Sequence, residues 1–191
     1  MLFTGIRPTN DAGGNPVVSS AQMTAQLRLD DPTELLYIAD LVDAAAEYAE
    51  QAMDTSLITR TCTVIHYQPP MYLTSVPVFT KQVKLFLPRG PVASITSVVD
   101  AISRAVTFTH ERQGTEDYAV LTGTFTMPIT VTYAAGWGTA AQVPADIRLA
   151  IRTHVVSLWE NRASVSDTHY LPVPHSLEEF YAKRRRTSSV A

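Results

Sequence analysis

Apolar side chains recur at helical spacing in the first third of the chain. Leu35, Ile38, Leu41, Val42, Ala45, Ala49 and Met53 share one face of a helix predicted over 32–54. The tetrapeptide Asp31-Pro32-Thr33-Glu34 marks its start, because aspartate is a common N-cap and proline suits the first helical position. A shorter helix over 20–29 precedes it, opened by a capping box of Ser19 and Gln22.

The middle of the chain changes to short runs of β-branched and aromatic residues, separated by proline and glycine. The strand candidates are 60–67, 83–87, 92–99, 105–109, 118–121 and 125–133. Runs this short, with turn residues between them, predict a small and mainly antiparallel β module over 60–133.

Helical spacing returns over 144–161. Its apolar face comprises Ile147, Ala150, Ile151, His154, Val155 and Leu158. Residues 163–174 contain two prolines and predict a loop, after which Ser176 and Glu179 form a capping box for a last short helix.

These elements predict an α+β fold. It consists of an N-terminal helix pair with a long second helix, the antiparallel β module, a C-terminal helix and an extended arm. We divide the chain into a flexible arm over 1–18, rich in Gly, Pro, Asn and Asp, a domain over 19–162, and a C-terminal arm over 163–191 that carries the short helix.

Composition narrows the class of protein. Of 191 residues, 46% are hydrophobic and only 17% are charged, where about a quarter is usual, so part of the surface is expected to be buried against other subunits. No apolar run approaches the roughly 18 residues of a membrane span. The single cysteine, Cys62, precludes an internal disulfide and suits a reducing cytoplasm.

The segment Gly136-Trp137-Gly138-Thr139-Ala140-Ala141 matches the G-x-G-x-x-A pattern of dinucleotide-binding sites. Such a site needs a helix that starts at the glycines and a second parallel strand ending in an acid. Here the predicted helix starts late, at Pro144, and Glu160, at the right distance for the acid, falls inside it. We therefore interpret Gly136, Trp137, Gly138 and Pro144 as a structural elbow between strand and helix.

Catalytic and metal-binding patterns are missing from the sequence. Cys62 and His66 would share one strand face about 13 Å apart, too far for a hydrogen bond. The histidines lack ligand spacing, and Glu116-Asp117 is interpreted as a pair of turn charges. We expect no enzyme, no cofactor and no metal; a hydrolase with a site built from dispersed residues remains the alternative.

Charge is unevenly distributed within a net charge of −3. Eight acids and no Lys or Arg lie between Asp30 and Asp54, which opposes a grip on DNA. The channel-facing or inter-subunit candidates are Asp40, Asp43, Glu47 and Glu50. The chain ends in a basic block that is either a solvated helix end or an arm that docks on a partner. We favour docking, through Phe180, Tyr181, Lys183, Arg184, Arg185 and Arg186.

Four segments in order resemble the head–tail connector proteins of tailed bacteriophages. They are MTAQLRLDDPTELLYIADLVDAAAEYAEQAMDTSLITRTCTV, LFLPRGPVASITSV, ITVTYAAGWGTAAQVPADIRLAIRTHVVSLWENR and LPVPHSLEEFYAKRR. The third is the closest match, with its strand, A-G-aromatic-G turn, V-P and helix ending in W-E-N-R. The arm over 1–18 and Met71–Gln82 depart from the pattern.

The resemblance implies an adaptor, or head-completion, protein of the virion that assembles in the host cytoplasm. Such proteins form a homo-oligomeric ring of about twelve subunits below the portal protein. The ring extends the channel through which DNA passes without sequence-specific binding, and it docks a stopper or tail-completion protein. They are not enzymes, need no cofactor and bind no membrane. The alternative function is an α+β DNA-binding or packaging accessory factor.

Overall fold

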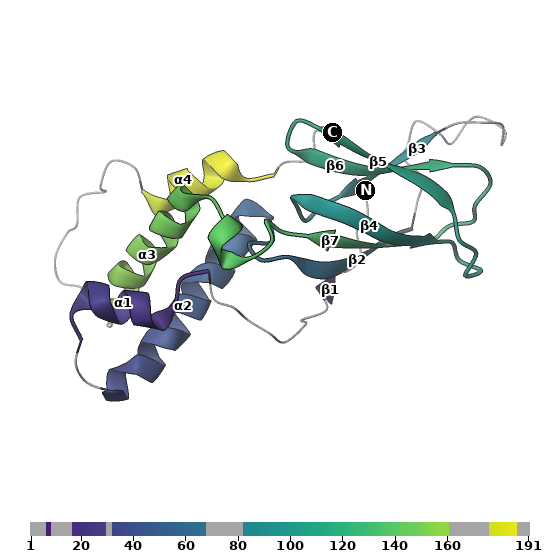
Figure 1. Ribbon diagram of the computed structural model, residues 1–191. Helices are drawn as coiled ribbons and strands as arrows, with labels where there is room; N and C mark the ends of the chain where they lie inside the picture. The colour runs from purple at the N-terminus through teal and green to yellow at the C-terminus, as the bar shows by residue number, and fades with distance from the viewer. Residues whose placement is uncertain (1–6, 9–16, 30–31, 68–81, 161–175, 187–191) are drawn as a thin grey trace. The chain divides into compact units, whose positions relative to one another are not determined.

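The computed structural model describes residues 7–8, 17–29, 32–67, 82–160 and 176–186. Most of the predicted arm over 1–18, the Asp31 N-cap and the loop over 163–174 lie outside the described residues. The chain forms two compact units. Unit 1 comprises Met1–Gly13, Thr59–Trp137 and Arg186–Ala191, and unit 2 comprises Gly14–Ile58 and Gly138–Arg185. The predicted α+β class is confirmed: the described residues form four α-helices and two small antiparallel sheets (Figure 1).

Unit 1 contains the strands. They are β1 (Arg7–Pro8), β2 (Arg60–His66), β3 (Val83–Leu87), β4 (Val92–Val99), β5 (Thr107–Gln113), β6 (Glu116–Thr122) and β7 (Ile129–Ala135). One sheet has the order β1-β2-β7-β4 and the other the order β3-β6-β5, and every pairing is antiparallel. The sequence pattern predicted β3 and β4 with the bounds that the structure shows. It ended β5 too early, because the polar residues of its second half show no strand-like alternation.

One hydrophobic core fills unit 1. Its side chains come from both sheets and include Val64, Leu85, Leu87, Leu121, Val131 and Tyr133. Along β7, buried and half-buried residues alternate through all seven positions, so one face of the strand supplies the core. In β6 the first six residues are all buried, which the sequence pattern did not indicate.

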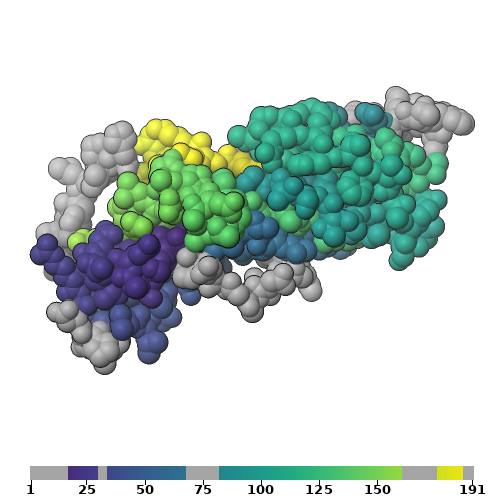
Figure 2. Space-filling view, viewed as in Figure 1, coloured from purple at the N-terminus to yellow at the C-terminus, as the bar shows by residue number. Residues whose placement is uncertain are grey.

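Unit 2 contains the helices α1 (Ser20–Leu27), α2 (Pro32–Met53), α3 (Ala145–Glu160) and α4 (Leu177–Arg184), with a short 3-10 helix, η2, at Ala140–Gln142. Helix α2 packs against α1, α3 and α4, and α1 and α3 adjoin at the surface (Figure 2). The buried face of α2 comprises Ile38, Val42, Ala45, Ala49 and Met53. Leu35, which the pattern placed on this face, is 41% exposed.

The helix ends follow local rules. Ser19 and Gln22 form the predicted capping box, and Arg28, in the left-handed region, ends α1 two residues earlier than predicted. The Pro144 carbonyl accepts the Arg148 N–H, so Pro144 precedes α3 instead of starting it. Ser176 Oγ accepts the Glu179 N–H, as the predicted start of α4 requires.

His66, the last residue of β2, makes the stability of the fold depend on pH. Burial lowers its pKa from the ordinary 6.5 to about 4. Between these values the unfolded chain binds the proton and the folded chain does not, so acidification favours unfolding. We expect the free energy of unfolding to fall by up to about 3 kcal/mol from pH 6.5 to pH 4 through this residue. Urea unfolding across this range should show a shallower fall for His66→Gln; equal pH slopes would contradict the prediction.

Candidate functional site

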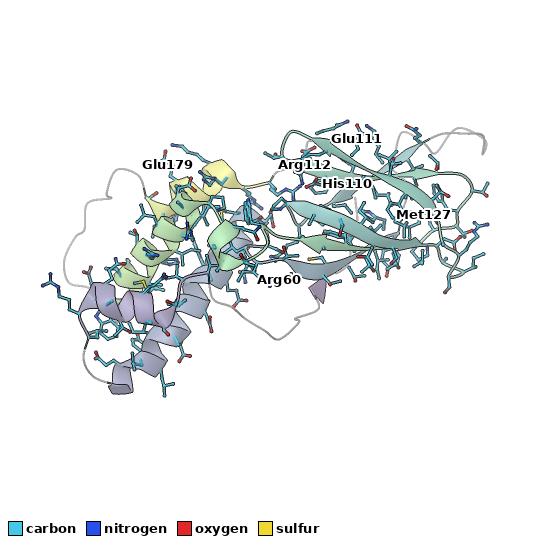
Figure 3. The ribbon with its side chains drawn as sticks, viewed as in Figure 1. Arg60, His110, Glu111, Arg112, Met127 and Glu179 are labelled. Atoms are coloured by element: carbon cyan, nitrogen blue, oxygen red, sulfur yellow. The ribbon has the colours of Figure 1, made fainter. Side chains whose placement is uncertain are left out.

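The residues singled out by sequence fall into three places: the elbow after β7, the exposed face of α2, and the C-terminal segment over 176–186. A fourth place, around Asp117 in β6, was not singled out. Figure 3 shows Glu179 on α4, and His110, Glu111 and Arg112 along β5, beside β6.

At the elbow, the chain passes from unit 1 to unit 2 between Trp137 and Gly138. Gly136 has φ +135° and Gly138 has φ +108°, in the region that disfavours residues with a side chain. Gly136 N–H donates to the Pro91 carbonyl at 2.8 Å. Nine residues separate β7 from α3, whereas in a dinucleotide site the helix starts at the glycines.

Gly138, the second glycine of the elbow, lies close to the hydrogen-bonded cap that Thr139 and Gln142 form at η2. Thr139 N–H donates to Gln142 Oε1 at 2.8 Å, and a Cβ on Gly138 would lie 2.0 Å from that oxygen. Together with the positive φ, this contact makes a side chain at 138 unfavourable.

Gly138→Ala is expected to lower the free energy of unfolding by about 1–3 kcal/mol, because alanine is strained at this φ and meets the Gln142 amide. Urea denaturation would measure the loss. Adding Gln142→Ala should recover the part of this loss that comes from the contact with the Gln142 amide. The part that comes from backbone strain at position 138 should remain. A Gly138→Ala protein as stable as the wild type would contradict the role of this glycine.

The four acidic candidates of α2 lie in two environments. Asp40, Asp43 and Glu47 are exposed, and their spacing of three and four residues places them on one side of the helix. Glu50 is 7% exposed, and its Oε1 accepts the Leu57 N–H at 2.8 Å. Glu50 therefore holds the turn after α2, whereas the first three acids remain available at the surface of the isolated chain.

The C-terminal segment binds to the chain's own residues. Tyr181 is fully buried, with Tyr48 at 6.0 Å and His154 at 6.5 Å between ring centroids. The Arg184 guanidinium lies over the Phe180 ring, 5.0 Å from its centroid.

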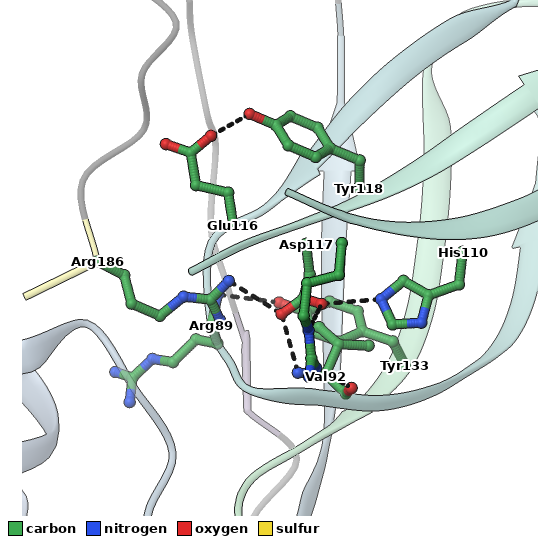
Figure 4. A network of polar contacts seen from close by, with 9 residues as sticks. Arg89, Val92, His110, Glu116, Asp117, Tyr118, Tyr133 and Arg186 are labelled. Atoms are coloured by element: carbon green, nitrogen blue, oxygen red, sulfur yellow. Dashed lines mark hydrogen bonds and ion pairs between the residues drawn. The ribbon is translucent and has the colours of Figure 1, made fainter. Parts of the chain in front are cut away.

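Each basic side chain of this segment pairs with an acid. Lys183 pairs with Glu179 at 2.7 Å, Arg184 with Asp146, and Arg185 with Asp54 at 3.2 Å; all three pairs are solvent-exposed. Exposed pairs of this kind stabilise a protein by about 1 kcal/mol or less each. The fourth, Arg186, is different because it is buried against Asp117 (Figure 4).

Asp117 is the centre of a buried polar cluster in unit 1. Its side chain is 1% exposed and accepts hydrogen bonds from Arg112 Nε at 2.8 Å, Val92 N at 3.1 Å and Arg186 Nη2 at 3.0 Å. His110 Nε2 lies 2.9 Å from the same carboxylate. Nearby, Tyr118 donates to Glu116, and the Arg89 N–H donates to the Tyr133 hydroxyl (Figure 4).

The hydrogen-bond donors around Asp117 favour its ionised form. Burial alone would raise the pKa of this carboxyl. The hydrogen bonds from Arg112, Val92 and His110 and the charge of Arg186 outweigh burial and hold its pKa below the ordinary value. Burial lowers the pKa of the Arg186 guanidinium, which Asp117 opposes. The interpretation of Glu116-Asp117 as turn charges is wrong, because both are buried strand residues of β6.

Other site types are missing from the described part of the chain. Cys62 and His66 are both buried on one face of β2. The described residues contain no group of His, Cys, Asp and Glu side chains that could hold a metal ion. None of the described helices is long and apolar enough to cross a membrane.

Comparison with solved structures identifies the fold. The chain superimposes on a chain in the neck of an empty gene transfer agent (GTA) particle with C6 symmetry, at a TM-score of 0.76 and 16% sequence identity. A chain in the neck of the native particle with C12 symmetry matches with a TM-score of 0.69 and 15% sequence identity. A chain in the native virion matches with a TM-score of 0.74 and 16% sequence identity. Each match covers 97% of both chains.

This chain has the fold of those particle chains. The likeness spans both units, so it concerns the whole fold and not one common supersecondary motif. No protein-family model and no curated protein sequence matches the chain.

Proposed function

We propose that the chain is a structural, non-enzymatic neck component of a phage-like particle. In this role it is an adaptor that forms a ring of about twelve copies below the portal protein, extends the DNA channel and docks a stopper or tail-completion protein. The supporting observation is the likeness to neck chains of gene transfer agent particles over 97% of both chains. Its place is the head–tail interface of the virion, reached after assembly in the host cytoplasm.

The surface of unit 2 is compatible with contacts between copies. Leu35, Leu36 and Tyr37 are consecutive on α2 and are 41%, 77% and 38% exposed. On α3, Leu149 is 62% exposed. Exposed large apolar side chains such as these are available for protein–protein contact, since water solvates them poorly. In a ring, a neighbouring copy would cover these side chains.

The exposed acids of α2 have a role in the same proposal. Asp40, Asp43 and Glu47 face either the channel or the next subunit. If they face the channel, they repel DNA phosphates and keep the duplex from adhering as it passes. A structure of the assembled ring that shows these three carboxylates on its outer surface would refute both positions.

The C-terminal segment is the proposed contact with the portal protein, through Phe180, Tyr181 and the basic residues after them. In the isolated chain Tyr181 and Arg186 are buried and the other basic side chains are paired within the chain. Portal binding would therefore require the segment to exchange these internal contacts for contacts with the portal.

The test is to mix the purified chain with purified portal rings from the same particle and to image the product by electron microscopy. The expected result is an added ring stacked on the portal in its symmetry. Portal rings imaged without the added chain are the control. No added density on the portal at saturating protein would reject the adaptor function. DNA affinity that falls steeply with salt would instead favour the packaging-factor alternative, since phosphate contacts release counterions.

A further inference from the structure

Arg186 occupies a site built from unit 1. Its guanidinium is held by Asp117 and lies directly over Gly90, where a Cβ would be 1.1 Å from Arg186 Nη1 and 2.2 Å from Cζ. We call Gly90, Val92 and Asp117 the arginine socket. The missing side chain at position 90 leaves the space that the planar guanidinium fills, so the socket is specific for shape as well as charge.

Arg186 is incompletely satisfied in the socket. Nη2 donates to Asp117, but Nε and Nη1 are buried without an acceptor among the described residues. Burying a donor without a partner is unfavourable, because the hydrogen bond to water is lost and not replaced. The docked state of Arg186 is therefore weaker than burial and the ion pair alone would suggest.

Asp117, in contrast, does not depend on Arg186. Arg112, His110 and the Val92 N–H remain as partners when Arg186 leaves. Arg112 also donates to the Val92 carbonyl at 2.9 Å, which keeps it beside the carboxylate. The socket thus keeps its shape and a compensated charge when it is empty. Because the empty socket is stable and bound Arg186 has unsatisfied donors, Arg186 is expected to enter and leave the socket reversibly.

The polar side chains in the rest of the C-terminal segment are also weakly held by the chain. The Tyr181 hydroxyl is buried and has no partner among the described residues, and the three exposed ion pairs before Arg186 are individually weak. Both buried side chains of the segment therefore retain unused hydrogen-bonding groups, which a partner surface rich in carboxylates and carbonyls could satisfy.

We propose that the arginine socket is a reversible binding site for a guanidinium group. It holds Arg186 in the isolated chain and releases the C-terminal segment when that segment binds the portal protein. The part that concerns the partner rests on the adaptor function proposed above; the part that concerns the socket does not. Docked Arg186 competes with partner binding, so emptying the socket raises affinity for the partner.

The test uses Gly90→Ala in the full chain, since its methyl group enters the space of the guanidinium and leaves every charge in place. We expect amide hydrogen exchange over residues 182–186 to rise about tenfold, with β6 and β7 unchanged. Arg186→Ala should give the same rise. Arg185→Ala is the matched control, because it removes the same charge from an exposed position, and it should leave exchange at position 186 as in the wild type. Unchanged exchange in Gly90→Ala would overturn the socket.

The partner step is tested with purified portal rings from the same particle. Gly90→Ala should bind them about tenfold more tightly than the wild type, in proportion to the release of the segment. Equal or weaker binding, with exchange raised, would overturn the competition and leave the socket standing. If neither protein binds portal rings while exchange still rises, the adaptor function fails and the socket does not.

Discussion

Asp117→Ala is expected to lower the free energy of unfolding by about 3–5 kcal/mol, the usual cost of removing one partner from a buried ion pair. The substitution removes the counter-charge of the Arg186 guanidinium and the acceptor of Arg112 and the Val92 N–H. Urea denaturation monitored by circular dichroism would measure the loss. Glu111→Ala is the control, because it breaks a solvent-exposed pair with Lys84 and should cause little change.

The same carboxylate gives the fold an acid-sensitive component. Because its folded pKa lies below the ordinary value near 3.8, the ionised form stabilises the fold fully above that value. The contribution is lost as the pH falls through the folded pKa. Asp117→Ala should therefore cost most near neutral pH and progressively less below pH 3.8. A cost that stays constant down to pH 2 would contradict this assignment.

Tyr181→Ala is also expected to lower the free energy of unfolding by about 3–5 kcal/mol, since it deletes a fully buried ring that contacts the rings of Tyr48 and Phe180. The residue lies in the segment proposed to bind the portal. Truncating the chain before α4 would therefore also remove a core side chain of unit 2. Loss of portal binding after truncation would not separate docking from folding, and point substitutions at Arg186 and Gly90 are the better test.

Tyr181→Phe separates the ring from its hydroxyl. Burial raises the pKa of this hydroxyl to about 12, and the group has no hydrogen-bond partner among the described residues. Phenylalanine keeps the ring and removes the unsatisfied oxygen, so we expect Tyr181→Phe to be about as stable as the wild type or up to about 1 kcal/mol more stable. A loss of more than that amount would mean that the hydroxyl has a partner in solution.

Local sequence signals were sufficient for most elements. Proline, serine and aspartate at helix starts, and apolar spacing along the helices, placed α2, α3 and α4 to within one or two residues. Runs of β-branched residues placed β3 and β4. These signals are reliable because capping and amphipathic burial depend on residues only a few positions apart.

Partnerships between distant residues could not be derived in this way. Asp117 meets Arg186 from 69 positions away, and Glu50 is buried because the backbone of Leu57 folds back onto it. In the sequence, Glu50 is indistinguishable from Asp43 and Glu47, which stay exposed. A carboxylate is buried only where donors converge on it, and convergence is a property of the folded chain.

The sequence by itself determined the α+β class and the order of the longer helices and strands, because these depend on short-range backbone preferences and on the period of apolar burial. It did not indicate β1, which lies in the predicted flexible arm and pairs with β2. The tertiary structure decided which charges are buried and which stay at the surface. It turned a basic tail into one buried arginine and three exposed ion pairs, because only the packed sheets place Asp117 and the bare backbone of Gly90 around the same guanidinium.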